Sequence, residues 1–123
     1  MTLTVLTVDD SRTMRDLLRA ALDGAGFRVL QADDGVHGLE VLGAQARSPD
    51  VIVTDINMPR MDGFGFIEAV RADAARRAVP ILVLTTESDL DKKARARAAG
   101  ATGWIVKPFQ SDKLVDAVRR VAA

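Results

Sequence analysis

Short apolar segments alternate with longer segments of helical periodicity along the whole chain. Five apolar runs have the length of β-strands: residues 3–8, 27–32, 51–54, 81–84 and 102–106. The first run is followed by apolar residues spaced like one face of a helix: Met14, Leu17, Leu18, Ala21 and Leu22. Five repeats of this alternation predict an α/β fold, with a parallel sheet covered by helices on both faces.

The polarity of the runs predicts their place in the sheet. Residues 51–54 and 81–84 are apolar almost throughout, as expected for central strands that are buried on both faces. The run at 27–32 is interrupted by Arg28 and Gln31, and we expect it to be an edge strand.

A helical segment follows each strand. The first helix is expected to begin at a cap formed by Asp10 or Ser11 and to end at residues 23–26, which contain two glycines. Four more helices are expected: one after the turn at 33–35, and others at roughly 63–71, 88–99 and 110–121.

The segment 88–99 differs from the other helices. Its predicted core-facing series is Leu90, Ala94 and Ala98, which offers mostly methyl groups. Burying an alanine rather than a leucine forgoes roughly 1–2 kcal/mol per site. We therefore expect this helix to be the most weakly packed.

Composition excludes several kinds of chemistry. The 123 residues include no cysteine and one histidine, which excludes disulfides, thiolate nucleophiles and histidine-cluster metal sites. Because 17 acidic and 17 basic residues balance, bulk charge indicates no nucleic-acid or membrane partner. No apolar run approaches the roughly 20 residues of a membrane span, and the N-terminus lacks a signal sequence. We expect one cytoplasmic, monomeric domain over residues 1–123, with no separate output domain.

Polar residues stand where the predicted parallel strands end. They are Asp9 and Asp10 after the first strand, Asp55 after the third, Thr85 after the fourth and Lys107 after the fifth. Ligands of open parallel α/β sheets bind beyond these carboxyl ends. Each residue also has an ordinary alternative role: a helix cap for Asp10, a strand end for Thr85 and a solvated charge for Lys107.

Three carboxylates crowded at one edge repel each other unless a cation compensates their charge. A hard divalent ion with oxygen ligands, most simply Mg²⁺, is the natural occupant. Because Mg²⁺ accompanies phosphate oxygens, the set suggests phosphoryl chemistry with Asp55 as the nucleophile. Lys107 and Thr85 would bind the oxygens of the transferred group.

The motifs around these residues resemble those of a known family. They are VDDSR at 8–12, TDINMPRMDG at 54–63, Thr85-Thr86, and KPF at 107–109. They are similar to the receiver domain of two-component response regulators, and most similar to its CheY-like single-domain chemotaxis members. The resemblance covers the whole chain. It implies a flavodoxin-like fold, with a five-stranded parallel sheet of order 2-1-3-4-5 between two helical layers.

The resemblance implies a role for each acidic residue. Asp55 would be the phospho-acceptor that takes a phosphoryl group from a CheA-like histidine kinase. The implied ligands of Mg²⁺ are the carboxylates of Asp10 and Asp55, the backbone carbonyl of Asn57, and Asp9 through a water molecule. The protein would assist its own phosphorylation and dephosphorylation rather than act as an enzyme on other substrates.

Further residues are implied to relay or time the signal. Thr85 and Lys107 would contact the phosphoryl group, and the bond between Lys107 and Pro108 is expected to be cis. Asn57 and Glu87 stand two residues after the acceptor and two after the threonine. In this family such residues shape the access of water to the acyl phosphate, so we expect self-dephosphorylation in seconds to minutes.

Trp104 stands where the family mostly has Tyr or Phe, a switch residue that swings inward when the threonine moves. A bulkier indole with its own N–H puts that inward movement in question, and leaves Trp104 as a reporter near the output face. We expect the output face to comprise helix 88–99, the fifth strand and the last helix. Its basic residues suit an acidic amphipathic peptide: Lys92, Lys93, Arg95, Arg97, Lys113, Arg119 and Arg120.

These features predict a response regulator that signals by phosphorylation-dependent binding, with a flagellar motor switch protein as the first candidate target and a phosphatase as a further partner. A phosphate sink that drains a shared chemotaxis kinase is the alternative within the family. A haloacid dehalogenase-type phosphatase would need a second acid where this chain has Asn57. A flavodoxin-like FMN carrier is disfavoured because Asp9 and Asp10 would face the cofactor phosphate.

The zero net charge is the sum of two unlike halves. Residues 1–62 hold 10 acids and 6 bases, a net of −4, and residues 63–123 hold 7 acids and 11 bases, a net of +4. An acidic pocket from the first half suits Mg²⁺ and an incoming phosphoryl group. A basic face from the second half suits a protein target.

Overall fold

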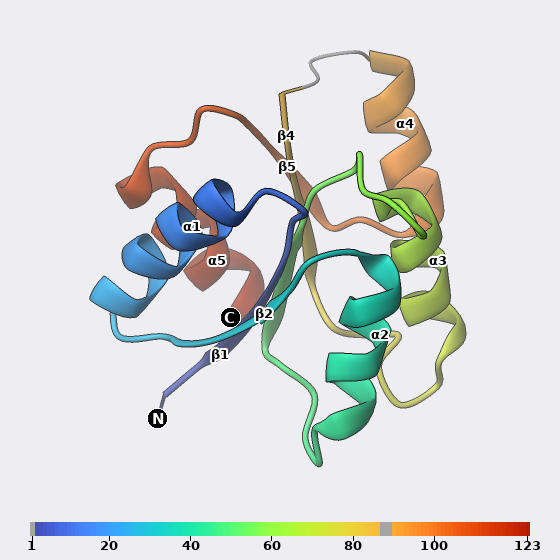
Figure 1. Ribbon diagram of the computed structural model, residues 1–123, viewed down its shortest axis with the longest axis horizontal. Coiled ribbons are helices and arrows are strands. Elements are labelled where there is room, and N and C mark those ends of the chain that lie inside the picture. Colours follow the sequence, from blue (N-terminus) through green and yellow to red (C-terminus); the bar gives the residue numbers. More distant parts are fainter. Residues whose placement is uncertain (1, 87–89) are drawn as a thin grey trace.

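Five parallel strands form one sheet, and helices cover both of its faces (Figure 1). The computed structural model describes residues 2–86 and 90–123. The strands are β1 (Thr4–Val8), β2 (Arg28–Ala32), β3 (Val51–Thr54), β4 (Ile81–Thr85) and β5 (Gly103–Val106). The helices are α1 (Arg12–Gly24), α2 (Gly35–Ala44), α3 (Gly63–Ala72), α4 (Leu90–Ala99) and α5 (Ser111–Ala122). None of the helices among these residues is long and apolar enough to span a membrane.

The strand order is β2-β1-β3-β4-β5, as the family resemblance implied. β2 lies at one edge, as its polar residues predicted, and β5 lies at the other. β3 and β4 are buried along their whole length, which confirms the prediction made from their apolar runs. Because the chain order reverses between β1 and β3, the carboxyl ends of these two strands border a crevice.

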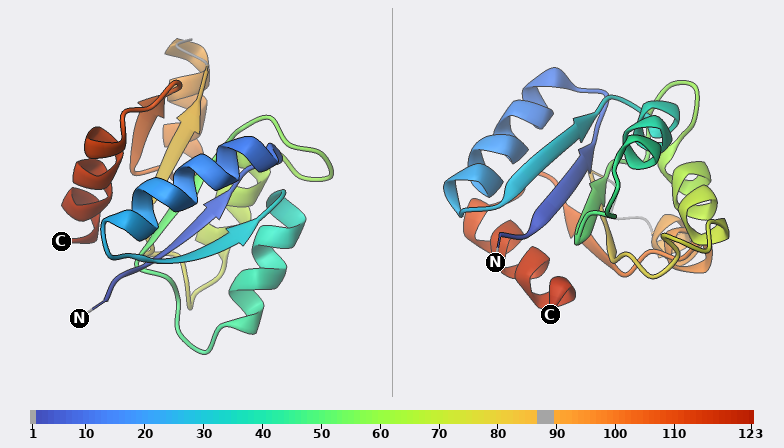
Figure 2. Two further views of the ribbon diagram at one scale, coloured as in Figure 1. Left: turned by 60° about the vertical axis from the view of Figure 1, so that its left-hand side comes forward. Right: turned by 90° about the horizontal axis from the view of Figure 1, so that it is seen from below.

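The two faces of the sheet belong to two separate cores. Successive residues of β1 alternate between them, since Val5 belongs to one core and Leu6 to the other. α1 and α5 cover the first face and bury Leu18 and Leu114. α2, α3 and α4 cover the second face, where Phe66 is fully buried (Figure 2).

α1 begins where a cap was expected. Ser11 is the N-cap, and its hydroxyl accepts a hydrogen bond from the Met14 N–H at 3.2 Å. Leu18 and Leu22 are buried as their spacing predicted. Leu17 also belongs to the predicted apolar face, but it is 52% exposed. It lines a groove of about 160 Å³ beside the loop between β5 and α5.

The predicted core-facing series of α4 is wrong. Ala96 is the buried residue of this helix, while the three residues predicted to face the core are exposed: Leu90, Ala94 and Ala98. Long basic side chains lie over aromatic rings beside Ala96. The Lys93 ammonium is 5.8 Å from the centre of the Trp104 ring, and the Arg95 guanidinium is 4.1 Å from that of Phe64. The aliphatic parts of such side chains pack against apolar neighbours. A sequence pattern that classes each residue as either apolar or polar overlooks this contribution.

Two glycines of α2 offer a matched test of this packing. A Cβ at Gly38 would lie 2.7 Å from Cε1 of the buried Phe66 ring, whereas a Cβ at Gly43 would meet nothing within 4 Å. We expect Gly38→Ala to lower the free energy of unfolding by about 1–3 kcal/mol through overpacking. Gly43→Ala should leave it unchanged or raise it by up to about 1 kcal/mol. Urea denaturation measures both, and equal stability of the two variants would contradict this packing.

Candidate metal site at the carboxyl edge of the sheet

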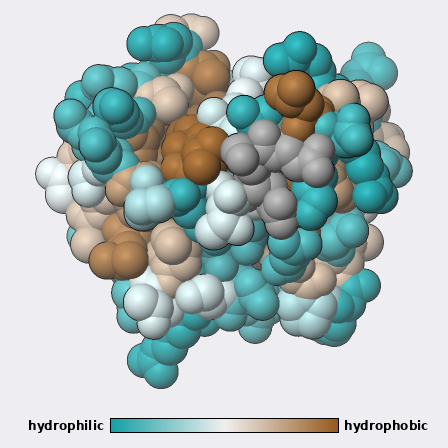
Figure 3. Space-filling model, turned by 90° about the horizontal axis from the view of Figure 1, so that it is seen from above, coloured by the Kyte–Doolittle hydropathy of each residue, from teal (hydrophilic) through white to brown (hydrophobic). Residues whose placement is uncertain are grey.

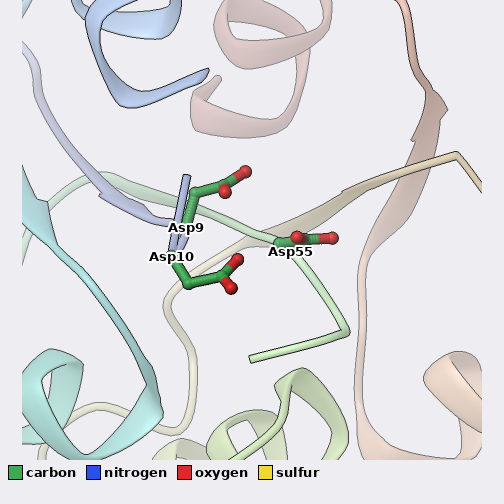
Figure 4. A group of neighbouring side chains, drawn as sticks. All are labelled: Asp9, Asp10 and Asp55. Atoms are coloured by element: carbon green, nitrogen blue, oxygen red, sulfur yellow. The ribbon is translucent and has the colours of Figure 1, made fainter. Parts of the chain in front are cut away.

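Three carboxylates converge beyond the ends of β1 and β3 (Figure 4). One oxygen each from Asp9, Asp10 and Asp55 lies within 4.8 Å of the others. β1 and β3 are paired neighbours, and their pairing continues into the site because the Asp55 N–H donates to the carbonyl of Val8 at 2.9 Å. Strand register therefore brings these acids together, as the sequence predicted.

Asp9 is the most deeply buried of the three acids. Its side chain is 1% exposed. Oδ1 accepts a hydrogen bond from the Ser11 N–H at 2.9 Å, and Oδ2 accepts one from Lys107 Nζ at 3.1 Å. The backbone carbonyl of Asp9 also accepts from Arg15 at 2.7 Å. Both carboxylate oxygens of Asp9 thus accept hydrogen bonds from the protein. Asp10 is exposed, so its carboxylate is more accessible to an ion.

Asp55 is 8% exposed at the end of β3. Its Oδ1 accepts a hydrogen bond from the Ile56 N–H at 2.8 Å, while Oδ2 lies 3.4 Å from Lys107 Nζ. Burial raises the pKa of Asp55 above its ordinary value, and the charge of Asp9 raises it further; the nearby Lys107 acts in the opposite direction. Ionisation of the Asp55 carboxyl therefore lowers the stability of the folded protein.

Lys107 supplies the positive charge between the two buried acids. Its side chain is 12% exposed, and Nζ contacts both Asp9 and Asp55. The bond from Lys107 to Pro108 is cis, as expected. Among the residues that the structure describes, one ammonium thus faces a cluster of three carboxylates. The local deficit of positive charge favours a cation.

Thr85 lies at the end of β4 and is fully buried. Its backbone carbonyl accepts a hydrogen bond from the Lys107 N–H at 2.7 Å, so the ends of β4 and β5 are joined beside the site. The register of β3 with β4 pairs Thr54 with Val83. Continued by two residues, it places Thr85 level with Ile56, which directly follows Asp55.

Of the remaining predicted site residues, the structure describes Asn57 and Trp104. Asn57 is exposed in the loop that follows Asp55. Glu87 lies outside the described residues. Trp104 of β5 is partly buried against the core beneath α4, and its Nε1 is buried with no hydrogen-bond partner among the described residues. The indole thus packs toward α4, under the Lys93 side chain.

Part of the predicted basic face contacts the protein itself: Lys93, Arg95 and Arg119 lie over aromatic rings. Arg119 is turned toward the segment between α1 and β2, where it donates to the carbonyl of Ala25 at 3.3 Å and lies 5.6 Å from the Phe27 ring. Lys93 and Arg95 are engaged with aromatic rings, as described above. The inclusion of Arg119 in a face shared with α4 is therefore wrong. Arg119 lies seven residues after Asp112, which is in the first turn of α5. This position alone does not show which neighbouring segment the Arg119 side chain contacts.

Two residues near the site were not found from the sequence. Arg60 and Asp34 form a close ion pair that ties the loop after Asp55 to the start of α2. Asp34 carries a recognisable signal as a capping residue before a helix, and it does cap α2. Arg60 follows Pro59 in a loop and has no periodicity that could indicate its partner.

The surface around the site is mainly polar. Figure 3 looks onto the end of the molecule where the strands finish, and shows hydrophilic side chains over much of this face, with a few apolar side chains among them. The acidic cluster supplies hard oxygen ligands at short mutual distances. This donor set fits Mg²⁺ in kind, since Mg²⁺ binds through one or two carboxylates and retains several waters.

Comparison with known proteins gives one consistent result. The family model for the response regulator receiver domain matches residues 5–119. The chain is 37% identical over 118 residues to the chemotaxis protein CheY of Pseudomonas aeruginosa, covering 95% of this chain and 94% of that one.

Solved structures agree with this result. The chemotaxis response regulator CheY4 of Vibrio cholerae is 44% identical, with a TM-score of 0.90, and covers 98% of this chain and 99% of its own. The receiver domain of a sensor histidine kinase from Pseudomonas aeruginosa is 26% identical with a TM-score of 0.90, covering 99% and 98% of the two chains. That domain was solved with a magnesium ion coordinated in its active site cleft.

The raised pKa of Asp55 predicts a gain in stability on neutralisation. A carboxyl whose pKa is higher in the folded protein destabilises it when ionised, so Asp55→Asn should be more stable than the wild type at pH 7 without Mg²⁺. The difference should shrink as the pH falls through the raised pKa of the folded state, and it should vanish below about pH 3, where the carboxyl is protonated in both states.

Urea denaturation in the presence of a chelator measures this effect. Asp116→Asn is the matched control, because Asp116 is exposed on α5 and its loss should change stability by less than about 0.5 kcal/mol. A wild type more stable than Asp55→Asn at pH 7 would contradict the account.

Proposed function

The chain belongs to the response regulator receiver family, and from this premise we propose that it is a phosphorylation-dependent signalling domain of a bacterial chemotaxis pathway. Asp55 is the phospho-acceptor. The observation that most supports this assignment is the buried Asp55 carboxylate, which has Lys107 Nζ at 3.4 Å and lies among further carboxylate ligands.

The geometry suggests which oxygen of Asp55 reacts. Oδ1 is held by the Ile56 N–H, while Oδ2 faces Lys107. In the proposed transfer, Oδ2 attacks the phosphorus of a phosphohistidine on the donor kinase. The new P–O bond forms as the P–N bond breaks, and the imidazole leaves with the electron pair of that bond. The Lys107 ammonium and Thr85 stabilise the charge on the transferred oxygens.

The acidic residues would hold Mg²⁺ in this function. Asp10 and Asp55 would bind it through their carboxylates, Asn57 through its backbone carbonyl and Asp9 through a water molecule. When bound, the ion neutralises the clustered carboxylates and the oxygens of the phosphoryl group. Compared with the exposed Asp10, Asp9 suits an indirect role because its side chain is 1% exposed and both of its carboxylate oxygens already accept hydrogen bonds from the protein.

The contacts of Lys107 offer a route from the site to the output surface. The ammonium that faces Asp55 belongs to the residue whose N–H is bonded to Thr85, at the joined ends of β4 and β5. Trp104 stands three residues before Lys107 on β5, with its indole under α4. We take Thr85 and Trp104 as the switch residues, so that a change at the phosphoryl group alters the seating of Trp104 and α4.

The chemotaxis relatives support a choice of partners. A CheA-like histidine kinase in the cytoplasm would donate the phosphoryl group, and a flagellar motor switch protein or another protein target would bind the phosphorylated form. The protein acts on its own carboxylate rather than on a separate substrate. Asn57 and Glu87 would set a phosphoform lifetime of seconds to minutes, with a phosphatase as a further partner.

Phosphorylation by a small donor tests the assignment. Wild type incubated with Mg²⁺ and acetyl phosphate should gain the mass of one phosphoryl group, detected by rapid intact-protein mass spectrometry. Asp55→Asn should gain none, and Lys107→Met should be labelled roughly a hundredfold more slowly because a charge-stabilising donor is lost. Asp116→Asn should behave as wild type. Labelling that persists in Asp55→Asn would refute the acceptor assignment.

A further inference from the structure

The loop between β3 and α3 contains a residue in an unfavourable conformation. Arg60 has a φ of 62°, and no other non-glycine residue in the described ranges 2–86 and 90–123 has a positive φ. Residues with a Cβ rarely adopt this left-handed conformation, because Cβ crowds the following carbonyl. It persists where surrounding contacts impose it, so the contacts of Arg60 are informative.

Arg60 is held by a two-point ion pair with Asp34. Its Nε donates to Oδ2 of Asp34 at 2.6 Å, and its Nη2 donates to Oδ1 at 3.0 Å. Asp34 is buried, and as the N-cap of α2 it also accepts a hydrogen bond from the His37 N–H at 2.8 Å. Because a planar guanidinium meets both oxygens of a fixed carboxylate, the pair sets the orientation of Arg60 as well as its distance.

The next residues of the same two segments are also joined. The Gly35 N–H donates to the carbonyl of Met61 at 3.2 Å. A Cβ on Gly35 would lie 2.7 Å from Cγ of Met61, so glycine permits this close approach. We call these two contacts, Arg60 with Asp34 and Gly35 with Met61, the loop clamp.

The other side of the loop is closed by Gly63. Its N–H donates to the carbonyl of Ile56 at 2.8 Å, and a Cβ on Gly63 would lie 2.8 Å from the Ile56 Cα. Asn57 therefore lies between two fixed points: the closed base at Ile56 and the clamp at Arg60. The contact at Ile56 is made by backbone atoms. The clamp instead includes the long side chain of Arg60, which is 55% exposed.

The clamp also connects this loop to the backbone beside Asp9. α2 begins three residues after β2 ends at Ala32, and the Asp9 N–H donates to the carbonyl of Ala32 at 3.1 Å. The start of α2 is thus fixed relative to Asp9 on one side and to the loop with Asn57 on the other. One connected set of contacts positions both parts of the acidic site.

We propose that Arg60 is a positioning residue that, through Asp34, fixes the backbone carbonyl of Asn57 relative to the carboxylates of Asp10 and Asp55 and so sets the affinity for Mg²⁺. The inference rests on the proposed function in one respect, the role of that carbonyl as a ligand of the ion. It assigns to Arg60 no contact with the ion or with the phosphoryl group.

Arg60→Gly is the informative variant. Glycine adopts a φ of 62° without strain, so the substitution removes the side-chain contacts and leaves the backbone conformation accessible. Arg47→Gly is the matched control, because Arg47 is exposed in the loop between α2 and β3 and carries the same charge. Arg60→Lys keeps the charge but cannot make the two-point contact.

Calorimetric titration with Mg²⁺ measures the effect. We expect the Kd of Arg60→Gly to rise about tenfold, as is typical when a group that orients a metal ligand is lost. Arg60→Lys should fall between Arg60→Gly and wild type, and Arg47→Gly should bind as wild type does. At saturating Mg²⁺, labelling of Arg60→Gly by acetyl phosphate should return to the wild-type rate, which a general loss of structure would not allow.

Asp34→Asn provides a second variant, since asparagine retains the helix cap and removes the charge that Arg60 pairs with. It should weaken Mg²⁺ binding in the same direction. The titration does not require phosphorylation, so a wild type that binds Mg²⁺ without being labelled would refute the proposed function and still test the clamp. Equal Kd values for Arg60→Gly and Arg47→Gly, or for Asp34→Asn and wild type, would overturn the role of Arg60.

Discussion

The Lys107 ammonium between the carboxylates of Asp9 and Asp55 is the interaction on which the rest of the site depends. It joins the ends of three strands that are far apart in the sequence, and it does so in a buried setting where an unpaired charge is costly. One ammonium cannot balance three acids, so the site keeps an excess of negative charge and a preference for a cation. In the proposed function, Mg²⁺ would compensate this excess and so allow a negatively charged phosphoryl group to approach Asp55.

The fold supplies this arrangement through backbone contacts rather than through the acids themselves. Register between β1 and β3 places Asp55 beside Asp9, and the bond from Lys107 to Thr85 places the lysine on the opposite side. The acids repel one another, and burial disfavours the charge of Asp55. The packing of the two apolar cores therefore offsets the unfavourable electrostatic energy of the site.

Much of the fold and of the acidic site could be predicted from the sequence. Both depend on the periodicity of the apolar residues and on which residues follow each strand. The continuous apolar runs of β3 and β4 identified buried central strands, and the acids that follow β1 and β3 had to meet at one edge. What failed depended on long side chains. Lys93 and Arg95 of α4 lie over aromatic rings, and Ala96 is buried in place of the predicted series. Arg119 lies over the ring of Phe27. The pairing of Arg60 with Asp34 spans 26 positions and has no local signature.

In the proposed function, one divalent cation completes the acidic cluster, in which Lys107 is already shared between Asp9 and Asp55. A crystal structure of the wild-type protein grown with saturating Mg²⁺ tests it most directly. We expect an ion bound to the carboxylates of Asp10 and Asp55 and the backbone carbonyl of Asn57, with Lys107 still paired with Asp9. A cluster without an ion at saturating Mg²⁺, or an ion that displaces Lys107 from Asp9, would contradict it.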